Sequence, residues 1–384
     1  MGKSRGSGQS PGNPPNGHRN GQTPSSNNPG GRPPAAGGAL AGGGSNSSVE
    51  KFYAELDRCW NLLERGDLDG AQSLALSLLR TDGDAPELYV LLGMIDGMQG
   101  EPEKALTYYE RAMDIDPEYV EPIICAAEVQ IWELEDFEKA LALCERALDL
   151  AEEEDEYVDA LLLKAEALSN LGREQAAYST LQELPEIALG EPSYHLRAAR
   201  LLLDLGYTQD AHEHFKRALM LDADNSDAIH GIGLCAGEDG DRAKMIDCFQ
   251  KVRVADLGEE PPPWGVPAER FAELCSTAID ELPEALRKLI ANVPVIATDY
   301  PSEELVKDGV DPRVLGLFNG VPHGDKPSLG GTPHLDAIFL FQRNIERMAY
   351  STEDVENEIH ITLVHEAGHF FGLSDDQLEA MGLG

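Results

Sequence analysis

Residues 89–117 read YVLLGMIDGMQGEPEKALTYYERAMDIDP, and this segment decides the fold of most of the chain. A turn at Gly100 separates two stretches of helical character, so the segment predicts a pair of antiparallel helices. Small residues at Gly93, Ala105 and Ala112 let such helices approach each other closely. A hairpin of this kind buries its apolar face only against a neighbouring hairpin, so an array of them is expected.

The same pattern recurs before and after this segment. Alanine occupies the equivalent position of five successive units, at Ala71, Ala105, Ala140, Ala177 and Ala211. The intervals between these alanines are 34, 35, 37 and 34 residues. A turn residue stands five positions before each alanine, in the order Gly66, Gly100, Glu135, Gly172 and Gly206. The spacing predicts about six units over residues 49–254, of which the last, 226–254, is degenerate.

This repeat resembles the tetratricopeptide repeat, in which paired helices of about 34 residues stack into a solenoid. The resemblance implies an all-α domain whose concave surface binds a peptide or helix of another protein. Val90, Met94 and Met98 are expected on that surface, which favours an apolar or mixed ligand. The alternative is an array that only packs against the C-terminal domain of its own chain.

A second motif, near the C-terminus, carries the candidate chemistry. Residues 365–375 read HEAGHFFGLSD, which is the pattern H-E-x-x-H-x-x-G-x-x-D. Histidines four residues apart leave the same face of a helix, so His365 and His369 can bind one metal ion. Glu366 can reach a water on that metal without being a ligand itself.

The alternative for this motif is a surface helix with two solvated histidines. An apolar stripe along the same helix argues against it, because a helix with such a stripe packs against a core. The stripe consists of Ile359, Leu363, Ala367 and Phe370.

A catalytic zinc site has three protein ligands and an open fourth position for water. The candidates for the third ligand are Asp375, Asp376 and Glu379, because only residues 373–384 remain after the turn at Gly372. Asp375 is favoured since it stands where the metzincin pattern H-E-x-x-H-x-x-G-x-x-H has its third histidine, and Asp376 is the second choice. Both aspartates also have a simpler explanation, as acids at the N-terminus of a last short helix.

These residues predict hydrolysis of peptide bonds. Bound Zn²⁺ lowers the pKa of its water to about 7 and polarises a carbonyl oxygen. Glu366 is the expected general base, which takes the water's proton and delivers it to the departing amine. The apolar strand expected at 338–341 would align an extended peptide by strand addition. Tyr350 and His360 are both available to stabilise the oxyanion, and the sequence favours neither.

The region before the motif predicts a small α/β unit. Its expected elements are an amphipathic helix over 269–282 and strands over 293–297, 315–318 and 338–341. Ser351 and Asp354 form a capping box that opens the metal-binding helix. His323 and His334 stand in a Gly/Pro-rich loop and are expected to be exposed rather than to be ligands.

Residues 264–384 resemble a known family, the small bacterial zincin-like metallopeptidases of minimal fold. Three segments carry the resemblance: LGLFNGVP at 315–322, IFLFQR at 338–343, and the 365–375 motif followed by DQL at 376–378. The resemblance implies a compact domain that ends soon after its metal helix. It also implies zinc binding, with Asp375 as the third ligand.

The chain is therefore expected to be multidomain, with an all-α tetratricopeptide-repeat solenoid followed by a small α+β zincin-like domain. A disordered tail is expected first, because its Gly, Pro, Asn and Ser residues bury almost nothing. The expected boundaries are 1–48 for the tail, 49–254 for the solenoid, 255–264 for a Pro-rich linker and 265–384 for the metallopeptidase domain.

The composition indicates which kinds of partner and which compartment are expected for the chain. The chain has 69 acidic and 30 basic residues and a formal net charge of −39, so nucleic acid and anionic membranes are poor partners. Its six cysteines include no C-x-x-C pair, which indicates buried thiols in a reducing compartment rather than disulfides. No stretch has the length and hydrophobicity of a membrane span, and the expected location is the cytoplasm.

The leading hypothesis is a cytoplasmic zinc metallopeptidase whose repeats recruit a protein substrate or a regulator. The rival is an interaction protein whose zincin-like domain binds metal but cuts little. A purely structural zinc site is disfavoured, because closed structural sites lack an open position beside a glutamate.

Overall fold

The computed structural model describes residues 46–81, 83–185, 190–282, 284–320 and 336–373, together with Gln377. They form two compact units, one within Thr23–Glu238 and one that contains Asp239–Gly384. Helix α1 (Asn46–Glu64) begins inside the last residues of the predicted tail, and the rest of that tail lies outside the described part of the chain.

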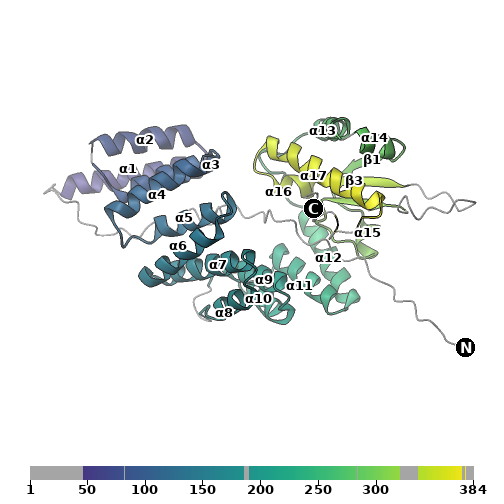
Figure 1. Cartoon of the computed structure of the whole chain (residues 1–384), viewed down its shortest axis with the longest axis horizontal. Coiled ribbons are helices and arrows are strands. Elements are labelled where there is room, and N and C mark those ends of the chain that lie inside the picture. Colours follow the sequence, from purple (N-terminus) through teal and green to yellow (C-terminus); the bar gives the residue numbers. More distant parts are fainter. Residues whose placement is uncertain are drawn as a thin grey trace, which may run out of the picture. The chain divides into compact units, whose positions relative to one another are not determined.

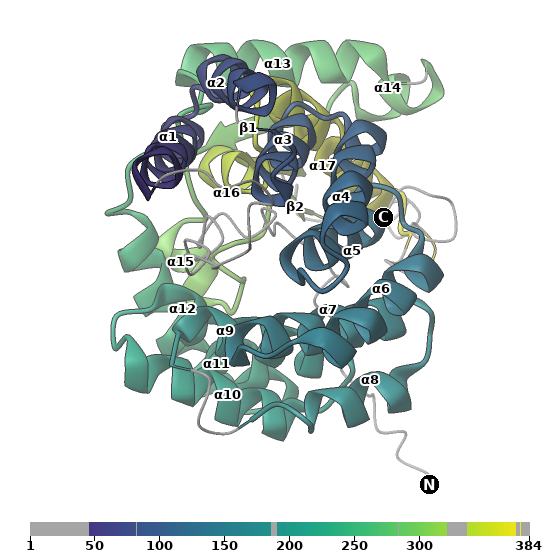
Figure 2. The same cartoon turned by 90° about the vertical axis from the view of Figure 1, so that its left-hand side faces the viewer.

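The first unit is an array of helical hairpins, which confirms the predicted all-α solenoid (Figure 1). Its described helices are α1, α2 (Leu68–Thr81), α3 (Pro86–Met98), α4 (Pro102–Ile115), α5 (Glu121–Trp132), α6 (Phe137–Leu150), α7 (Glu154–Asn170), α8 (Glu174–Leu181), α9 (Pro192–Asp204), α10 (Thr208–Leu221) and α11 (Ser226–Glu238). Consecutive helices pack in pairs. The odd-numbered helices of neighbouring pairs also contact one another, so they line the inner side of the array (Figure 2).

The hairpin turns use a backbone conformation that favours glycine. All five predicted turn residues have a positive φ, from 67° to 79° at the four glycines and 52° at Glu135. Among the described non-glycine residues, Glu135 alone has a positive φ. L side chains disfavour this left-handed region, so the third turn carries strain that the glycine turns avoid.

Small residues occupy the places where helices meet. The five alanines of the repeat are fully buried: Ala71, Ala105, Ala140, Ala177 and Ala211. A Cβ added to Gly93 would lie 2.4 Å from the ring of Tyr109, and one added to Gly231 would lie 2.2 Å from the ring of Phe215. Aromatic rings of α4 and α10 therefore pack directly against the backbone of a neighbouring helix, which glycine permits.

Val90, predicted on the concave surface, lies elsewhere. It is fully buried and packs with Ala105 and Tyr109 in the core. Met98 is 54% exposed, and Met94 is half-buried. The apolar character predicted for the inner surface therefore depends on the two methionines.

The second unit combines helices with a three-stranded sheet (Figure 1). Its described elements are α12 (Arg242–Asp256), α13 (Ala268–Glu281), α14 (Glu284–Ile290), β1 (Val295–Thr298), α15 (Glu303–Lys307), β2 (Gly316–Asn319), β3 (Ala337–Phe341), α16 (Gln342–Met348) and α17 (Thr352–Phe370). The predicted helix and strands of this region are confirmed to within two residues at each end. Their apolar faces meet in one core, to which α13, β3 and α17 contribute Phe271, Ile338 and Leu363.

The strand order is β1-β3-β2, with β1 parallel and β2 antiparallel to β3. Ile338 of β3 is thus paired with Val295 on one side and with Phe318 on the other. A strand that is paired on both sides has no free edge for a further strand. The predicted role of 338–341 in aligning a substrate by strand addition is therefore wrong, and β2 is the edge strand that packs beside α17.

The two units divide between Glu238 and Asp239, before the region predicted as a linker. Helix α12 therefore belongs to the second unit, although the repeat pattern predicts it as part of the last hairpin. At its end, Asp256 is fully buried and forms ion pairs with Arg313 at 3.0 Å and Arg347 at 3.1 Å. A buried carboxylate is tolerated only beside cations. The ion pairs of Asp256 therefore fix the end of α12 to the rest of the second unit.

The cysteines are present as thiols. None of the six forms a disulfide, and five of them are buried. Burial raises the pKa of the Cys144 and Cys275 thiols to about 12, so both stay protonated at neutral pH. None of the described helices is both long enough and apolar enough to cross a membrane.

The ion pairs of Asp256 predict a large effect on stability. In Asp256→Ala the guanidinium groups of Arg313 and Arg347 lose their buried partner, which should lower the stability of the second unit by about 3–5 kcal/mol. The control is Asp247→Ala on the same helix, whose exposed ion pair with Lys251 should contribute little. Hydrogen exchange of the α17 amides measures both effects. Equal losses of protection would show that the buried pairs contribute no more than the exposed one.

Candidate metal centre

Helix α17 carries the candidate metal ligands in its last two turns. At its start the Ser351 hydroxyl accepts a hydrogen bond from the Asp354 N–H at 3.1 Å, as the capping box predicts. Just past its end, Gly372 turns the chain with a φ of 78°. The predicted apolar stripe is buried in the core and consists of Ile359, Leu363, Ala367 and Phe370. Burial of this stripe fixes the rotation of the helix and leaves His365 and His369 half-buried on another face.

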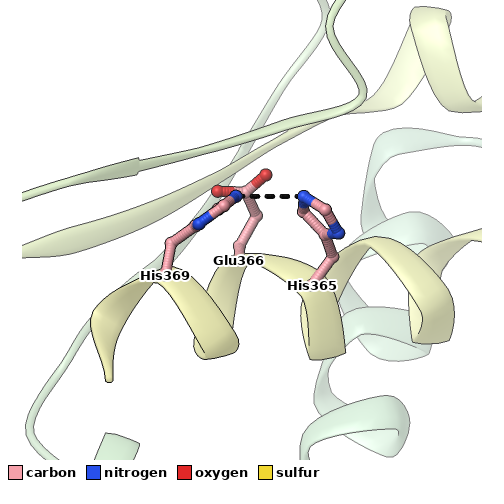
Figure 3. Close-up of side chains that lie close together, drawn as sticks. All are labelled: His365, Glu366 and His369. Atoms are coloured by element: carbon pink, nitrogen blue, oxygen red, sulfur yellow. Dashed lines mark hydrogen bonds between the residues drawn. The ribbon is translucent and has the colours of Figure 1, made fainter. Parts of the chain in front are cut away.

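The two histidines lie close enough to share one ion (Figure 3). Their Nε2 atoms are 3.0 Å apart, and their rings are nearly perpendicular, with an interplanar angle of 84°. Two nitrogens bound tetrahedrally to zinc at about 2.0–2.1 Å lie roughly 3.3 Å from each other. The spacing of the pair therefore fits a shared Zn²⁺, which each imidazole would bind through Nε2.

A main-chain carbonyl determines which ring nitrogen of His369 carries the proton. Nδ1 of His369 lies 3.1 Å from the carbonyl oxygen of Leu373, which the turn at Gly372 brings back towards the helix. A carbonyl oxygen only accepts, so the proton resides on Nδ1 and the lone pair of Nε2 faces His365. Metal-binding histidines are commonly oriented by such a contact, so the donor chemistry fits a metal ligand.

Glu366 lies beside the histidine pair and is held by the sheet. It is 7% exposed, and its Oε2 accepts a hydrogen bond from the main-chain N–H of Phe318 on β2 at 2.5 Å. One ligand atom of Glu366 lies within 4.8 Å of a ring nitrogen of each histidine. Figure 3 shows the carboxylate on the same side of the helix as the two imidazoles. A carboxylate in this position can contact a water on the shared ion.

The close approach of α17 to β2 depends on Gly316. A Cβ at this position would lie 2.7 Å from Cγ2 of Thr362 and 2.8 Å from Cγ of Glu366. Sequence reasoning missed both this glycine and the N–H of Phe318. The available signal was a glycine inside an apolar strand, which often marks a close approach of another element.

Other predicted site residues lie outside the described part of the chain. These are the candidates for the third ligand, Asp375, Asp376 and Glu379. The loop histidines His323 and His334, predicted to be exposed and not to be ligands, also lie outside the described residues.

The two candidate oxyanion donors do not face the histidine pair. Tyr350 stands 15 residues before His365, or roughly 20 Å along the helix axis. Its ring packs near Trp264, with the ring centroids 6.2 Å apart. His360 stands five residues before His365, which places it roughly 140° around the helix.

Comparisons with known proteins identify both parts of the chain. Residues 290–384 match the family described as zincin-like metallopeptidase, and residues 86–119 and 132–201 match tetratricopeptide repeats. The chain therefore carries tetratricopeptide repeats and a C-terminal zincin-like metallopeptidase domain, which confirms both predicted resemblances. No curated protein matches the chain.

Several solved structures resemble the chain in fold alone. PilF of Pseudomonas aeruginosa is 15% identical with a TM-score of 0.47, and the match covers 56% of this chain and 96% of that one. MamA of Desulfovibrio magneticus is 18% identical with a TM-score of 0.39, covering 46% of this chain and 98% of that one. A tetratricopeptide repeat protein of Parabacteroides merdae is 20% identical with a TM-score of 0.41, covering 53% and 79% respectively.

Gly316→Ala tests the spacing between α17 and β2. The added methyl group collides with Thr362 and Glu366, so the helix must move away from the strand at a cost of about 1–3 kcal/mol. Metal affinity should fall as well, because His365 moves with the helix. Thermal unfolding and competition with a chromophoric chelator measure the two effects. Gly190→Ala is the control, since a Cβ there meets no atom within 4 Å. Unchanged metal affinity in Gly316→Ala would show that this spacing does not matter to the site.

Proposed function

We propose that the C-terminal unit is a zinc-dependent metallopeptidase and that the repeats recruit its protein substrate or a regulator. The observation that carries the proposal is the geometry on α17, where two imidazole Nε2 atoms 3.0 Å apart share a face with a buried glutamate. The match of residues 290–384 to zincin-like metallopeptidases supports it. The repeats support recruitment because solenoids of this kind present an inner surface to a peptide or helix.

In this reaction the residues of the chain would have the following roles. His365 and His369 hold the ion through Nε2, and the Leu373 carbonyl keeps the lone pair of His369 directed at it. Bound Zn²⁺ supplies a water with a pKa of about 7 and polarises the scissile carbonyl. Glu366 accepts a proton from the attacking water and transfers it to the nitrogen of the departing amine. The Phe318 N–H holds one carboxylate oxygen, which limits rotation of the carboxylate away from the water.

We assign the third ligand to Asp375, with Asp376 and Glu379 as the alternatives. An aspartate is a normal oxygen ligand of zinc and makes the site less positive than a third histidine would. The spacing of Asp375 from the two histidines in H-E-x-x-H-x-x-G-x-x-D supports the assignment.

The state of the cysteines supports a proposal for the compartment. None of the six forms a disulfide. Thiols persist unpaired where the medium is reducing, so the cytoplasm is the proposed location.

A second candidate function is an interaction protein whose zincin-like domain binds zinc without cutting peptides. The observation that favours it concerns Tyr350 and His360, which both lie away from His365. One oxyanion donor contributes roughly 10²–10³-fold to kcat, and neither candidate among the described residues is in place to do so.

Glu366→Gln separates these two functions. The amide cannot accept the water's proton, so peptide cleavage should fall by about 10²–10⁴-fold while zinc stays bound. The control is Glu353→Gln, the same change in the exposed first turn of α17, which should keep full activity. The measurement combines chelator-sensitive cleavage of an unfolded-protein and peptide library with metal analysis of each variant.

Cleavage by the wild type that Glu366→Gln abolishes would support the peptidase. Stoichiometric zinc with no cleavage of any library member would favour the interaction protein. A purified chain that holds no transition metal would refute both.

Asp375→Ala should weaken zinc binding by roughly 100-fold or more, because loss of a ligand costs more than loss of an outer-shell partner. Asp376→Ala, the same change one residue later, is the control and should retain zinc. Titration with a competing chelator gives both affinities. The opposite result, with zinc lost only from Asp376→Ala, would exchange the roles of the two aspartates.

A further inference from the structure

Carboxylates gather on the inner side of the repeats, where α5, α7 and α9 pack against one another. Glu121 and Glu128 belong to α5, and Asp159 and Glu166 belong to α7. Arg197 of α9 is the cation that acts on Glu128, Asp159 and Glu166. These five residues are here called the inner acidic cluster. Three of the four carboxylates therefore share a single guanidinium.

Most of the cluster is satisfied internally. Three carboxylates accept a hydrogen bond, Asp159 from Arg197 at 2.8 Å, Glu166 from Trp132 at 2.9 Å and Glu121 from Tyr119. Glu128 differs, because it is 8% exposed and has neither a hydrogen bond nor an ion pair within the described residues. Nη2 of Arg197 is likewise buried without an acceptor in the described part of the chain. The cluster thus contains one carboxylate without a partner and one buried donor without an acceptor, both within the described residues.

Burial without a partner is unfavourable for a carboxylate. Burial raises the pKa of Glu128 to about 8, although the guanidinium of Arg197 lowers it. The carboxylates of Asp159, Glu166 and Glu121 raise that pKa further. A positive charge beside Glu128 would therefore be attracted by every carboxylate of the cluster. A second cation beside Glu128 would therefore stabilise its charged form.

We propose that the inner acidic cluster binds a lysine or arginine side chain from an extended peptide segment of a protein partner. The cationic group lies against the carboxylate of Glu128. The inference rests on the recruiting role proposed for the repeats and not on the chemistry at His365. It makes specific the mixed ligand predicted for the concave surface.

Two other kinds of ligand fit the cluster less well. A divalent cation needs several ligand atoms close together, and within the described residues the group that offers them is His365, Glu366 and His369. An anion would meet four carboxylates and a guanidinium already paired with Asp159. A lysine or arginine side chain needs one well-placed carboxylate, which it reaches on a flexible apolar stem.

The first experiment selects peptides from a random-sequence library with the full-length chain carrying Glu366→Gln, so that bound peptides stay intact. Lysine or arginine should be enriched at one position of the selected peptides. Adding Glu128→Gln should remove this enrichment, whereas adding Glu145→Gln, the same change at an exposed site on α6, should retain it. Enrichment of acidic residues, of apolar residues alone or of no residue type would overturn the proposal.

A double-mutant cycle then assigns the contact. One selected peptide is synthesised with its basic residue and with glutamine in its place, and fluorescence anisotropy gives each dissociation constant. Loss of the basic residue should weaken binding about tenfold or more when Glu128 is present, and by a factor near one in Glu128→Gln. Equal weakening in both proteins would place the basic residue elsewhere and overturn the proposal.

The unliganded chain gives an independent readout. Glu128 holds its proton more tightly in the folded chain than in the unfolded chain, where the pKa of a glutamate is about 4.3. The folded state therefore loses stability as the pH rises from about 5 to above 8. The groups that face position 128 are the same in the wild type and in Glu128→Gln, so they do not account for a difference between the two. These groups are Glu121, Cys125, Asp159, Glu166 and Arg197. Glu128→Gln should thus melt higher than the wild type at pH 9, with a smaller difference at pH 5.

A lower melting temperature of Glu128→Gln at pH 9 would reveal a structural partner for Glu128 and would overturn the proposal. The peptidase is decided separately, by cleavage. A chain that selects basic peptides but cuts nothing would refute the peptidase and support peptide binding by the inner acidic cluster. A chain that cuts peptides without selecting basic ones would support the peptidase and refute binding by the cluster.

Discussion

The close approach of α17 to β2 is the constraint on which the candidate metal centre depends. Gly316 leaves room for the helix, and Phe318 donates its N–H to Glu366. Because β2 pairs with the central strand β3, the position of this carboxylate is tied to the core of the whole unit. The histidines follow from the same packing, since one buried stripe fixes the rotation of α17. The proposed general base is thus held by a sheet rather than by a loop, which limits its movement.

Features that depend on residues close together in the sequence could be predicted from it. All five residues that stand five positions before a repeat alanine have a positive φ, including Glu135, which no glycine rule would select. The helix and strands of the second unit lie within two residues of their predicted limits, because apolar runs and breakers are local signals. The histidine pair is equally local, since a spacing of four residues alone places both imidazoles on one face.

Features that require distant residues to meet could not be predicted. The N–H of Phe318 meets Glu366 across 48 positions, and Arg313 meets Asp256 across 57. An apolar run identifies a strand but not its neighbours, so the central place of β3 was missed. For the same reason the pattern of α12 suggests another repeat, whereas its buried Asp256 attaches it to the second unit.

The hairpin of α5 and α6 combines two unfavourable features. Its turn holds Glu135 in the left-handed region, at a cost of roughly 1–2 kcal/mol, and α5 buries the carboxylate of Glu128. In a linear array each hairpin is stabilised by its immediate neighbours, so a weak hairpin in the middle interrupts cooperativity. We therefore expect the helices before and after it to unfold as separate blocks. A ligand that contacts α5, α7 and α9 would join these blocks. The array with such a ligand bound would then be mechanically continuous from its first hairpin to its last.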